Sequence, residues 1–355
     1  MPFLTADNTN ILMDLNEIGE CPPVPGWAPM EQHALKVEDM RRFKDAGATV
    51  ALEFLPWSKV NPGADVWDWA YADEMIDRCH NAGLKVLFMG PCDVPQWMPD
   101  DWYVWLGDGT PLRKPDARNP MHTYGLLSPW NPDSANAQLE FITRMCERYN
   151  SNEVLCIYGN SNCGESMLPE ASPALYDPAA IKSFQALVHK NDVRPNVYDL
   201  ETQYWMCSSM REWMLGQQQI FLTHPSRELF LSLAPYYQLF SASANANVAG
   251  YIDAIVNRLH PAQMSYISFT YFQITYELPY CQWFKHMSTL YGVKFVVGSE
   301  WLSGAVENAP KARDQGLRLL TGIIHPFTHH YTVEDDMVEQ MRQSHAIMVG
   351  EAIPA

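Results

Sequence analysis

The sequence predicts an α/β fold, a single-domain (β/α)8 TIM barrel with long loops on its catalytic face, on the basis of three observations. Apolar runs of strand length alternate with stretches of helical periodicity along all 355 residues. The alternation gives eight strand–helix units, the number found in such a barrel. No Gly-rich phosphate-binding turn follows an early strand, and that turn would be typical of the alternative, an open doubly wound sheet.

The first half of the chain carries four predicted strands separated by three predicted helices. The first two helices end at Gly47 and Gly83, and glycine is the residue favoured just after a helix C-terminus. We predict strands over residues 10–16, 49–55, 84–89 and 154–158, and helices over residues 31–46, 67–82 and 134–149. The loops after the third and fourth strands are long and rich in Trp, Tyr, Pro and Asn, which suits stacking against sugar rings.

The second half repeats this alternation less regularly. We predict strands over residues 228–233, 264–270, 293–297 and 320–324, and helices over residues 177–190, 200–219, 247–259, 280–291, 311–319 and 333–349. No linker, low-complexity tract or short repeat divides the chain. Residues 1–355 are therefore expected to form one catalytic domain.

Two glutamates follow closely after predicted strands. The run at 154–158 leads into a glycine-containing polar turn that carries Glu165, and the run at 293–297 is followed at once by Gly-Ser-Glu-Trp, with Glu300. In a parallel barrel the C-terminal ends of the strands share one face, so the two carboxyl groups are expected to meet there. We predict Glu165 as general acid and Glu300 as nucleophile or water-activating base on a glycosidic bond. The competing interpretation for Glu165 is a helix cap or an ion pair with a surface lysine. For Glu300 it is a carboxylate favoured by the dipole at a helix N-terminus.

Further residues at predicted strand ends are expected to line the pocket and to bind substrate. They are aromatic, amide, acidic and imidazole side chains, which together can stack on sugar rings and hydrogen-bond their hydroxyls. These residues are Glu53, Trp57, Asp93, Trp97, Asn160, Asn162, Tyr236, Tyr271, Gln273, Trp301 and His325.

Composition excludes some classes of partner. The formal charge is −17, from 24 basic and 41 acidic residues, which disfavours nucleic acid and anionic membrane surfaces. The N-terminal residues lack the pattern of a secretory signal, and no apolar run is long enough for a membrane span. We therefore expect a cytoplasmic protein with a carbohydrate substrate, and the sequence leaves the oligomeric state open.

Neither a cofactor nor a metal is expected. The eight cysteines are scattered, without Cys-x-x-Cys or Cys/His zinc spacing. The first predicted strand carries no histidine, whereas metal-dependent barrel hydrolases typically pair histidines there. Cys163 lies two residues before Glu165 but has no evident partner histidine, so we interpret it as a packed turn residue.

Four segments of the first half form a further pattern: residues 47–63, Val66-Trp-Asp-Trp, Ala82-Gly-Leu-Lys-Val and Ser128-Pro-Trp-Asn-Pro. Through these segments the chain resembles glycoside hydrolases of the β-galactosidase (family 42) and β-amylase (family 14) types. The resemblance covers residues 30–170 well and the second half only through strand order and Glu300. It implies a barrel in which Glu165 matches the acid after strand four and Glu300 the carboxylate after strand seven.

The chain also departs from the family 42 pattern. Family 42 has Asn directly before its acid, whereas Gly164 precedes Glu165 here, and Gly164-Glu165-Ser-Met-Leu-Pro169 is closer to the β-amylase pattern. Family 42 also places an arginine in its second strand, and this chain has no matching arginine there. The chain therefore resembles a divergent member of the wider group. Family 42 retains the anomeric configuration and β-amylases invert it, with carboxyl separations of about 5–5.5 Å and about 6.5–9.5 Å respectively.

These observations predict a glycosidase that cleaves O-glycosidic bonds of an oligo- or polysaccharide. The alternatives are a glycan transferase or transglycosidase using the same site, a non-catalytic carbohydrate-binding barrel and a metal-dependent hydrolase. The sugar, the linkage and endo or exo action are left open by the sequence.

Overall fold

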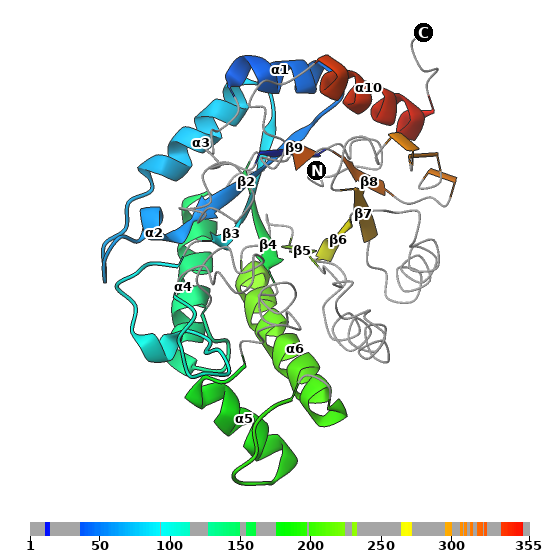
Figure 1. Cartoon of the computed structure of the whole chain (residues 1–355). Helices are drawn as coiled ribbons and strands as arrows, with labels where there is room; N and C mark the ends of the chain where they lie inside the picture. The colour runs from blue at the N-terminus through cyan, green and yellow to red at the C-terminus, as the bar shows by residue number, and fades with distance from the viewer. Residues whose placement is uncertain are drawn as a thin grey trace.

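In the structure, a computed structural model, strands alternate with one or two helices over residues 11–232 (Figure 1). Two predicted helices, over residues 247–259 and 280–291, lie outside the described residues. The described residues are 11–14, 36–92, 94–113, 127–149, 154–160, 175–196, 199–223, 229–232, 264–271, 295–299, 306–307, 309–310, 313–314, 318–321, 323–324 and 335–350.

The elements occur in an order close to the predicted one. The strands are β1 (Ile11–Asp14), β2 (Val50–Pro56), β3 (Lys85–Cys92), β4 (Val154–Asn160), β5 (Leu229–Ser232), β6 (Met264–Tyr271), β7 (Phe295–Ser299), β8 (Arg318–Thr321) and β9 (Ile323–Ile324). The labelled helices are α1 (Val37–Asp45), α2 (Trp57–Val60), α3 (Ala70–Asn81), the 3-10 turn η1 (Asp100–Trp102), α4 (Pro132–Arg148), α5 (Pro178–Val188), α6 (Leu200–Thr223) and α10 (Asp335–Val349).

The strands form one sheet in which every pairing is parallel. Each strand from β1 to β8 pairs with the strand that follows it in sequence, and β9 pairs with β1. The two strands at the ends of this order are neighbours in the chain, since β8 ends at Thr321 and β9 begins at Ile323. Figure 1 shows α1, α3, α4 and α10 around the outside of the curved sheet. The predicted α/β class with a parallel sheet is confirmed.

Local side-chain bonds explain where two helices begin. The Asn131 side chain accepts hydrogen bonds from the amides of Asp133 and Ser134 at 2.9 and 3.2 Å, and a proline occupies the first turn of α4. Capping oxygens and an early proline are typical helix starts. The predicted helix at 67–82 begins later, at Ala70, whose amide donates to Asp68 Oδ1 at 2.9 Å.

The two glycine helix ends are confirmed. Gly47 and Gly83 have φ of +110° and +80°, a region that side chains rarely adopt. A Cβ on Gly47 would lie 2.4 Å from the Cγ of His345, a residue of α10. The N-terminal part of α10 also meets α1, through an ion pair between Arg42 and Asp335. The first and last labelled helices therefore pack together.

Two apolar clusters hold the described part of the chain. The larger joins β2 and β3 to α1, α3, α4 and α10, with Phe43, Phe88 and Phe141 fully buried. The second joins the loop after β3 to α5 and α6, around Trp205. This second cluster fixes part of the long loop that the sequence placed after the third strand.

The predicted start of the eighth strand is wrong. The sequence predicted a helix over 311–319 and a strand over 320–324, but Arg318 and Leu319 already belong to β8. They pair in register with Val296 and Val297 of β7. Strand pairing with β7 therefore overrides the helical periodicity of that run.

Candidate active site

The two segments that carry the predicted catalytic glutamates start at the same edge of the sheet. β4 ends at Asn160, five residues before Glu165, and β7 ends at Ser299, directly before Glu300. Only β5 and β6 separate β4 from β7 in the sheet order. Because all pairings are parallel, the C-terminal ends of these strands point the same way. Glu165 and Glu300 themselves lie outside the described residues.

Most of the predicted substrate-binding residues also fall outside the described part of the chain. For Asn160 and Tyr271 the structure gives the backbone, as the last residues of β4 and β6. Residues Asp93, Asn162, Tyr236, Gln273, Trp301 and His325 lie outside the described ranges. Their roles stay predictions.

Glu53 lies in a buried ion pair, which corrects the expectation that it binds substrate. Its side chain is 0% exposed. One carboxylate oxygen accepts from Arg78 Nη2 at 3.1 Å and the other from the Cys79 thiol at 3.1 Å, both on α3. Glu53 therefore faces the helix layer, where a substrate cannot reach it. Strand alternation explains the placement, since successive side chains of β2 point to opposite faces.

Trp57 is a core residue, which corrects the expectation that it floors a sugar subsite. It begins α2 directly after β2, is 1% exposed, and its ring lies 5.1 Å from that of Phe141. The same aromatic group contains Trp67 and Trp69, stacked 6.0 Å apart. Neither face of Trp57 is open to a ligand.

Trp97 is accessible, unlike Trp57, the other predicted aromatic residue whose side chain the structure describes. It lies in the loop after β3 and is 36% exposed. The indole Nε1 donates to the carbonyl of Asn61 at 2.9 Å, and the ring meets Trp102 edge-on at 6.4 Å. These contacts fix the ring orientation while leaving surface exposed, as a sugar-stacking residue requires.

Asp177 is a buried titratable residue to which the sequence assigned only a helix start. As the N-cap of α5, it accepts from the Ala180 amide at 2.9 Å and the Ser128 hydroxyl at 3.0 Å. Its other oxygen, Oδ2, is buried without a hydrogen-bond partner. Burial raises the pKa of Asp177 from 3.8 to about 6, although both hydrogen bonds lower it. The signal that could have found it is an Asp-Pro helix start beside a tryptophan-rich loop.

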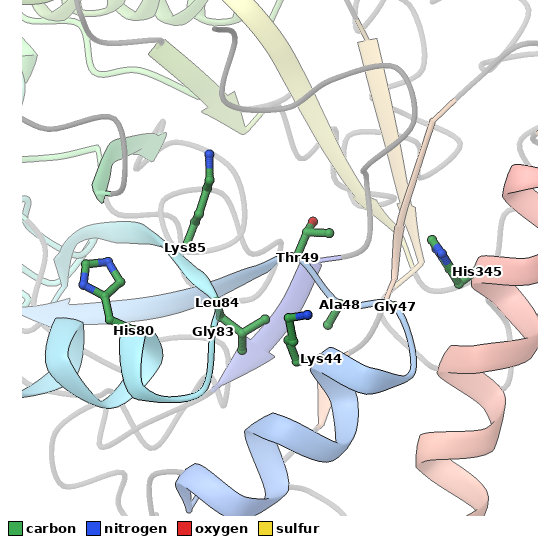
Figure 2. Close-up of a pocket in the computed structure, with 9 residues that line it drawn as sticks. All are labelled: Lys44, Gly47, Ala48, Thr49, His80, Gly83, Leu84, Lys85 and His345. Carbon is green, nitrogen blue, oxygen red and sulfur yellow. The ribbon is translucent and has the colours of Figure 1, made fainter.

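A pocket of about 590 Å³ lies at the other end of the strands (Figure 2). It is formed by the turns that precede β2 and β3 and by His345 of α10. Lys44, His80 and Lys85 give it basic character. The predicted catalytic groups follow the C-terminal ends of β4 and β7, so this pocket is not where they are expected.

Two further findings concern metal ligands and membrane-spanning helices. Within the described ranges, no group of three or more His, Cys, Asp or Glu side chains is arranged to hold a metal ion. In the same ranges, no helix combines the length and apolar character needed to cross a membrane.

Comparison with known sequences identifies one family. Residues 29–354 match the sequence profile of glycoside hydrolase family 42, which is described as β-galactosidase. The match includes both segments that carry the predicted catalytic glutamates.

Solved structures of glycoside hydrolases share the fold. The catalytic domain of β-amylase from Paenibacillus polymyxa is 12% identical with a TM-score of 0.56, over 90% of this chain and 93% of that one. The β-galactosidase from the psychrophilic Marinomonas ef1 is 12% identical with a TM-score of 0.60, over 97% of this chain and 60% of that one. A broad-specificity endoglucanase from an uncultured bacterium is 10% identical with a TM-score of 0.55, over 96% and 94%. The chain thus spans 60% of the length of that β-galactosidase.

Proposed function

The chain belongs to glycoside hydrolase family 42, and from this premise we propose that it hydrolyses O-glycosidic bonds by a two-carboxylate mechanism. Family membership confirms the predicted enzyme class, a glycosidase. The observation that carries the mechanism is that Glu165 and Glu300 follow β4 and β7 in a sheet whose strands are all parallel. Two carboxyl groups at one edge are the minimum for acid/base cleavage of a glycoside.

In this proposal Glu165 donates a proton to the leaving oxygen as the glycosidic bond breaks. Glu300 attacks the anomeric carbon, and the glycosyl–enzyme ester that forms is hydrolysed by a water that Glu165 deprotonates. The β-amylase-like segment from Gly164 to Pro169 supports the inverting variant of the same site. There Glu300 activates water for direct attack, and the product has the opposite anomeric configuration.

We also propose that the sheet closes into a complete (β/α)8 barrel formed by one catalytic domain. Support comes from β8 and β9, which pair with β7 and β1 although only residue 322 separates them. If β8 and β9 form one continuous strand, that strand pairs with β7 on one side and with β1 on the other, which closes the sheet. Closure brings the ends of all eight strands around one opening.

The family description makes a β-galactoside the first substrate to test. We expect Glu165→Gln and Glu300→Gln each to lower kcat by at least about a hundredfold while leaving the circular dichroism spectrum unchanged. Glu140→Gln is the matched control, because Glu140 is exposed and forms an ion pair with Arg144 in the next turn of α4. Near-normal turnover by either variant would remove that residue from the mechanism.

Leaving-group dependence separates the two roles. An aryl β-galactoside with an acidic phenol needs little proton donation, so Glu165→Gln should lose much less activity on it than on lactose. Glu300→Gln should lose activity equally on both. The anomer formed first, followed by NMR, then distinguishes retention from inversion. Equal losses in both variants on both substrates would contradict the assignment.

A further inference from the structure

A second pocket lies away from the strand ends, between α5 and the loop after β3. Its volume is about 360 Å³, at the small end of the range of about 300–1,000 Å³ typical of ligand sites. Pro178, Ile181, Lys182 and Gln185 line it from α5. Their spacing of three, four and seven residues puts all four on one face of the helix. In Figure 1, α5 lies beyond the end of α6 that is remote from the sheet.

The opposite wall is aromatic and is held in place by the backbone. Trp105 and Tyr176 line the pocket, and the Tyr176 amide donates to the Trp105 carbonyl at 3.0 Å. Trp105 Nε1 donates to the Asp100 carbonyl at 3.0 Å. Val104, Leu106 and Leu175, which flank these two residues in the sequence, belong to the apolar cluster around Trp205. The two rings are therefore supported by the fold before any ligand binds.

The polar groups of the pocket are basic or neutral. Lys182 and Arg194 are exposed, and neither forms an ion pair with any residue that the structure describes. Gln185 donates through Nε2 to the Val193 carbonyl at 3.0 Å, which leaves its Oε1 as an acceptor. In a chain of net charge −17, two unpaired cations beside two aromatic rings are a specific arrangement.

Two carboxylates that directly adjoin pocket residues in the sequence are already engaged. Asp108 Oδ1 accepts from the Thr110 amide within its own turn at 3.0 Å. Asp177 is buried and bonded to Ser128 and Ala180. Among the described residues that line the pocket there is no acidic side chain.

From this arrangement we propose that the pocket binds an acidic sugar residue, with its ring against Trp105 and Tyr176 and its carboxylate or sulfate against Lys182 and Arg194. Aromatic faces pack on the C–H faces of sugars, and Arg and Lys pair strongly with carboxylate and sulfate oxygens. The choice of a saccharide over another anion rests on the proposed function. The enzyme would then use this pocket to hold an acidic polysaccharide while it cleaves elsewhere.

The test measures binding by calorimetry with the Glu300→Gln variant of the whole chain, which the proposed function expects to be inactive, so that turnover does not interfere. Tetragalacturonate should bind at least tenfold more tightly than neutral galactotetraose, and its affinity should fall with added salt. The double variant Lys182→Gln/Arg194→Gln should lose at least tenfold in affinity for tetragalacturonate. Lys190→Gln is the matched control: Lys190 follows α5, lies outside the pocket residues and pairs with Glu201 at 3.5 Å. Its affinity should be unchanged.

Three results would overturn the proposal. The first is equal binding of the neutral and acidic oligosaccharides. The second is unchanged affinity in the double variant. The third is displacement by inorganic sulfate at equimolar concentration, which would reduce the pocket to a simple anion site. If tetragalacturonate binds but no glycoside is cleaved by the wild-type enzyme, the binding site stands and the proposed hydrolytic function fails. If β-galactosides are cleaved but tetragalacturonate does not bind at this pocket, the proposed hydrolytic function stands and the binding site fails.

Discussion

Glu53 and Asp177 are both fully buried carboxylates, yet their surroundings differ. Glu53, between β2 and α3, has the guanidinium of Arg78 against one oxygen and the thiol of Cys79 against the other. Asp177, at the start of α5, has only neutral donors, and Oδ2 has none. The comparison teaches that burial alone does not decide how a carboxylate contributes. A neighbouring cation stabilises the ionised carboxylate in the folded protein. With neutral donors alone, burying the ionised carboxylate still costs free energy.

Breaking the Glu53 pair should have the largest effect. Glu53→Gln leaves Arg78, whose side chain is only 20% exposed, without its carboxylate. We expect a loss of about 3 kcal/mol in the free energy of unfolding, at the low end of values for buried pairs, because Arg78 keeps some contact with water. Urea denaturation measures it. In the double variant Glu53→Gln/Arg78→Met much of the loss should be recovered, and a loss below about 1 kcal/mol in the single variant would show that the pair is dispensable.

Asp177 should respond to pH in a way that an asparagine cannot. Because its folded pKa is about 6 and its ordinary value is 3.8, the folded state binds the proton more tightly than the unfolded state does. The stability that Asp177 contributes is fully present below pH 4, and it is lost as pH rises through about 6. A shift of this size corresponds to roughly 3 kcal/mol.

The measurement for Asp177 is the stability of wild type minus that of Asp177→Asn between pH 4 and pH 7. Asparagine caps a helix about as well as aspartate, so the N-cap bond to Ala180 is kept. We expect the difference to fall steadily over that range. A difference that is constant with pH would mean that Asp177 has an ordinary pKa in the folded protein.

Removing a neutral donor should have a smaller effect. Ser128→Ala deletes the hydroxyl that donates to Asp177 Oδ1 and accepts from the amides of Trp130 and Asn131. We expect a loss of about 1–2 kcal/mol at pH 7. The loss should shrink below pH 4, where Asp177 is protonated. Thermal unfolding at both pH values measures it, and an equal loss at each would argue against a link between Ser128 and the Asp177 charge.

The smallest effect is expected where the carboxylate is exposed. Glu140 pairs with Arg144 at 2.8 Å, with both side chains about half exposed. Glu140→Gln should cost about 0.3–0.5 kcal/mol and less in 1 M salt. Urea denaturation at low and high salt provides this reference for the two buried sites. A cost above about 1.5 kcal/mol would show that exposure is not what separates the three carboxylates.

The sequence predicted the elements of the fold better than the orientation of individual side chains. The glycine helix ends and the parallel order of the strands follow from local chemistry and from hydrophobic periodicity. Glu53 was misplaced because position near a strand end does not say which face of the strand a side chain occupies. The signal that Glu53 faces the helix layer was Arg78 on the following helix, which can pair with a buried carboxylate.

Trp57 was misplaced for a different physical reason. Aromatic residues after a strand suit a sugar subsite and a hydrophobic core equally well. The decision depends on tertiary packing against Phe141, 84 residues further along the chain. The catalytic pair stays a prediction, because Glu165 and Glu300 lie outside the described residues. The sequence order of the strands did place the segments that precede them, β4 and β7, in one parallel sheet.

The packing of α10 on α1 has a consequence for synthesis of the chain. Arg42 and Asp335, which pair across these helices, are separated by 293 residues. While the ribosome makes those residues, the face of α1 that α10 will cover has no native partner. The nascent chain must therefore keep its first helix soluble until α10 has emerged, and a pause before α10 would prolong the period in which α1 is open to aggregation or to chaperones.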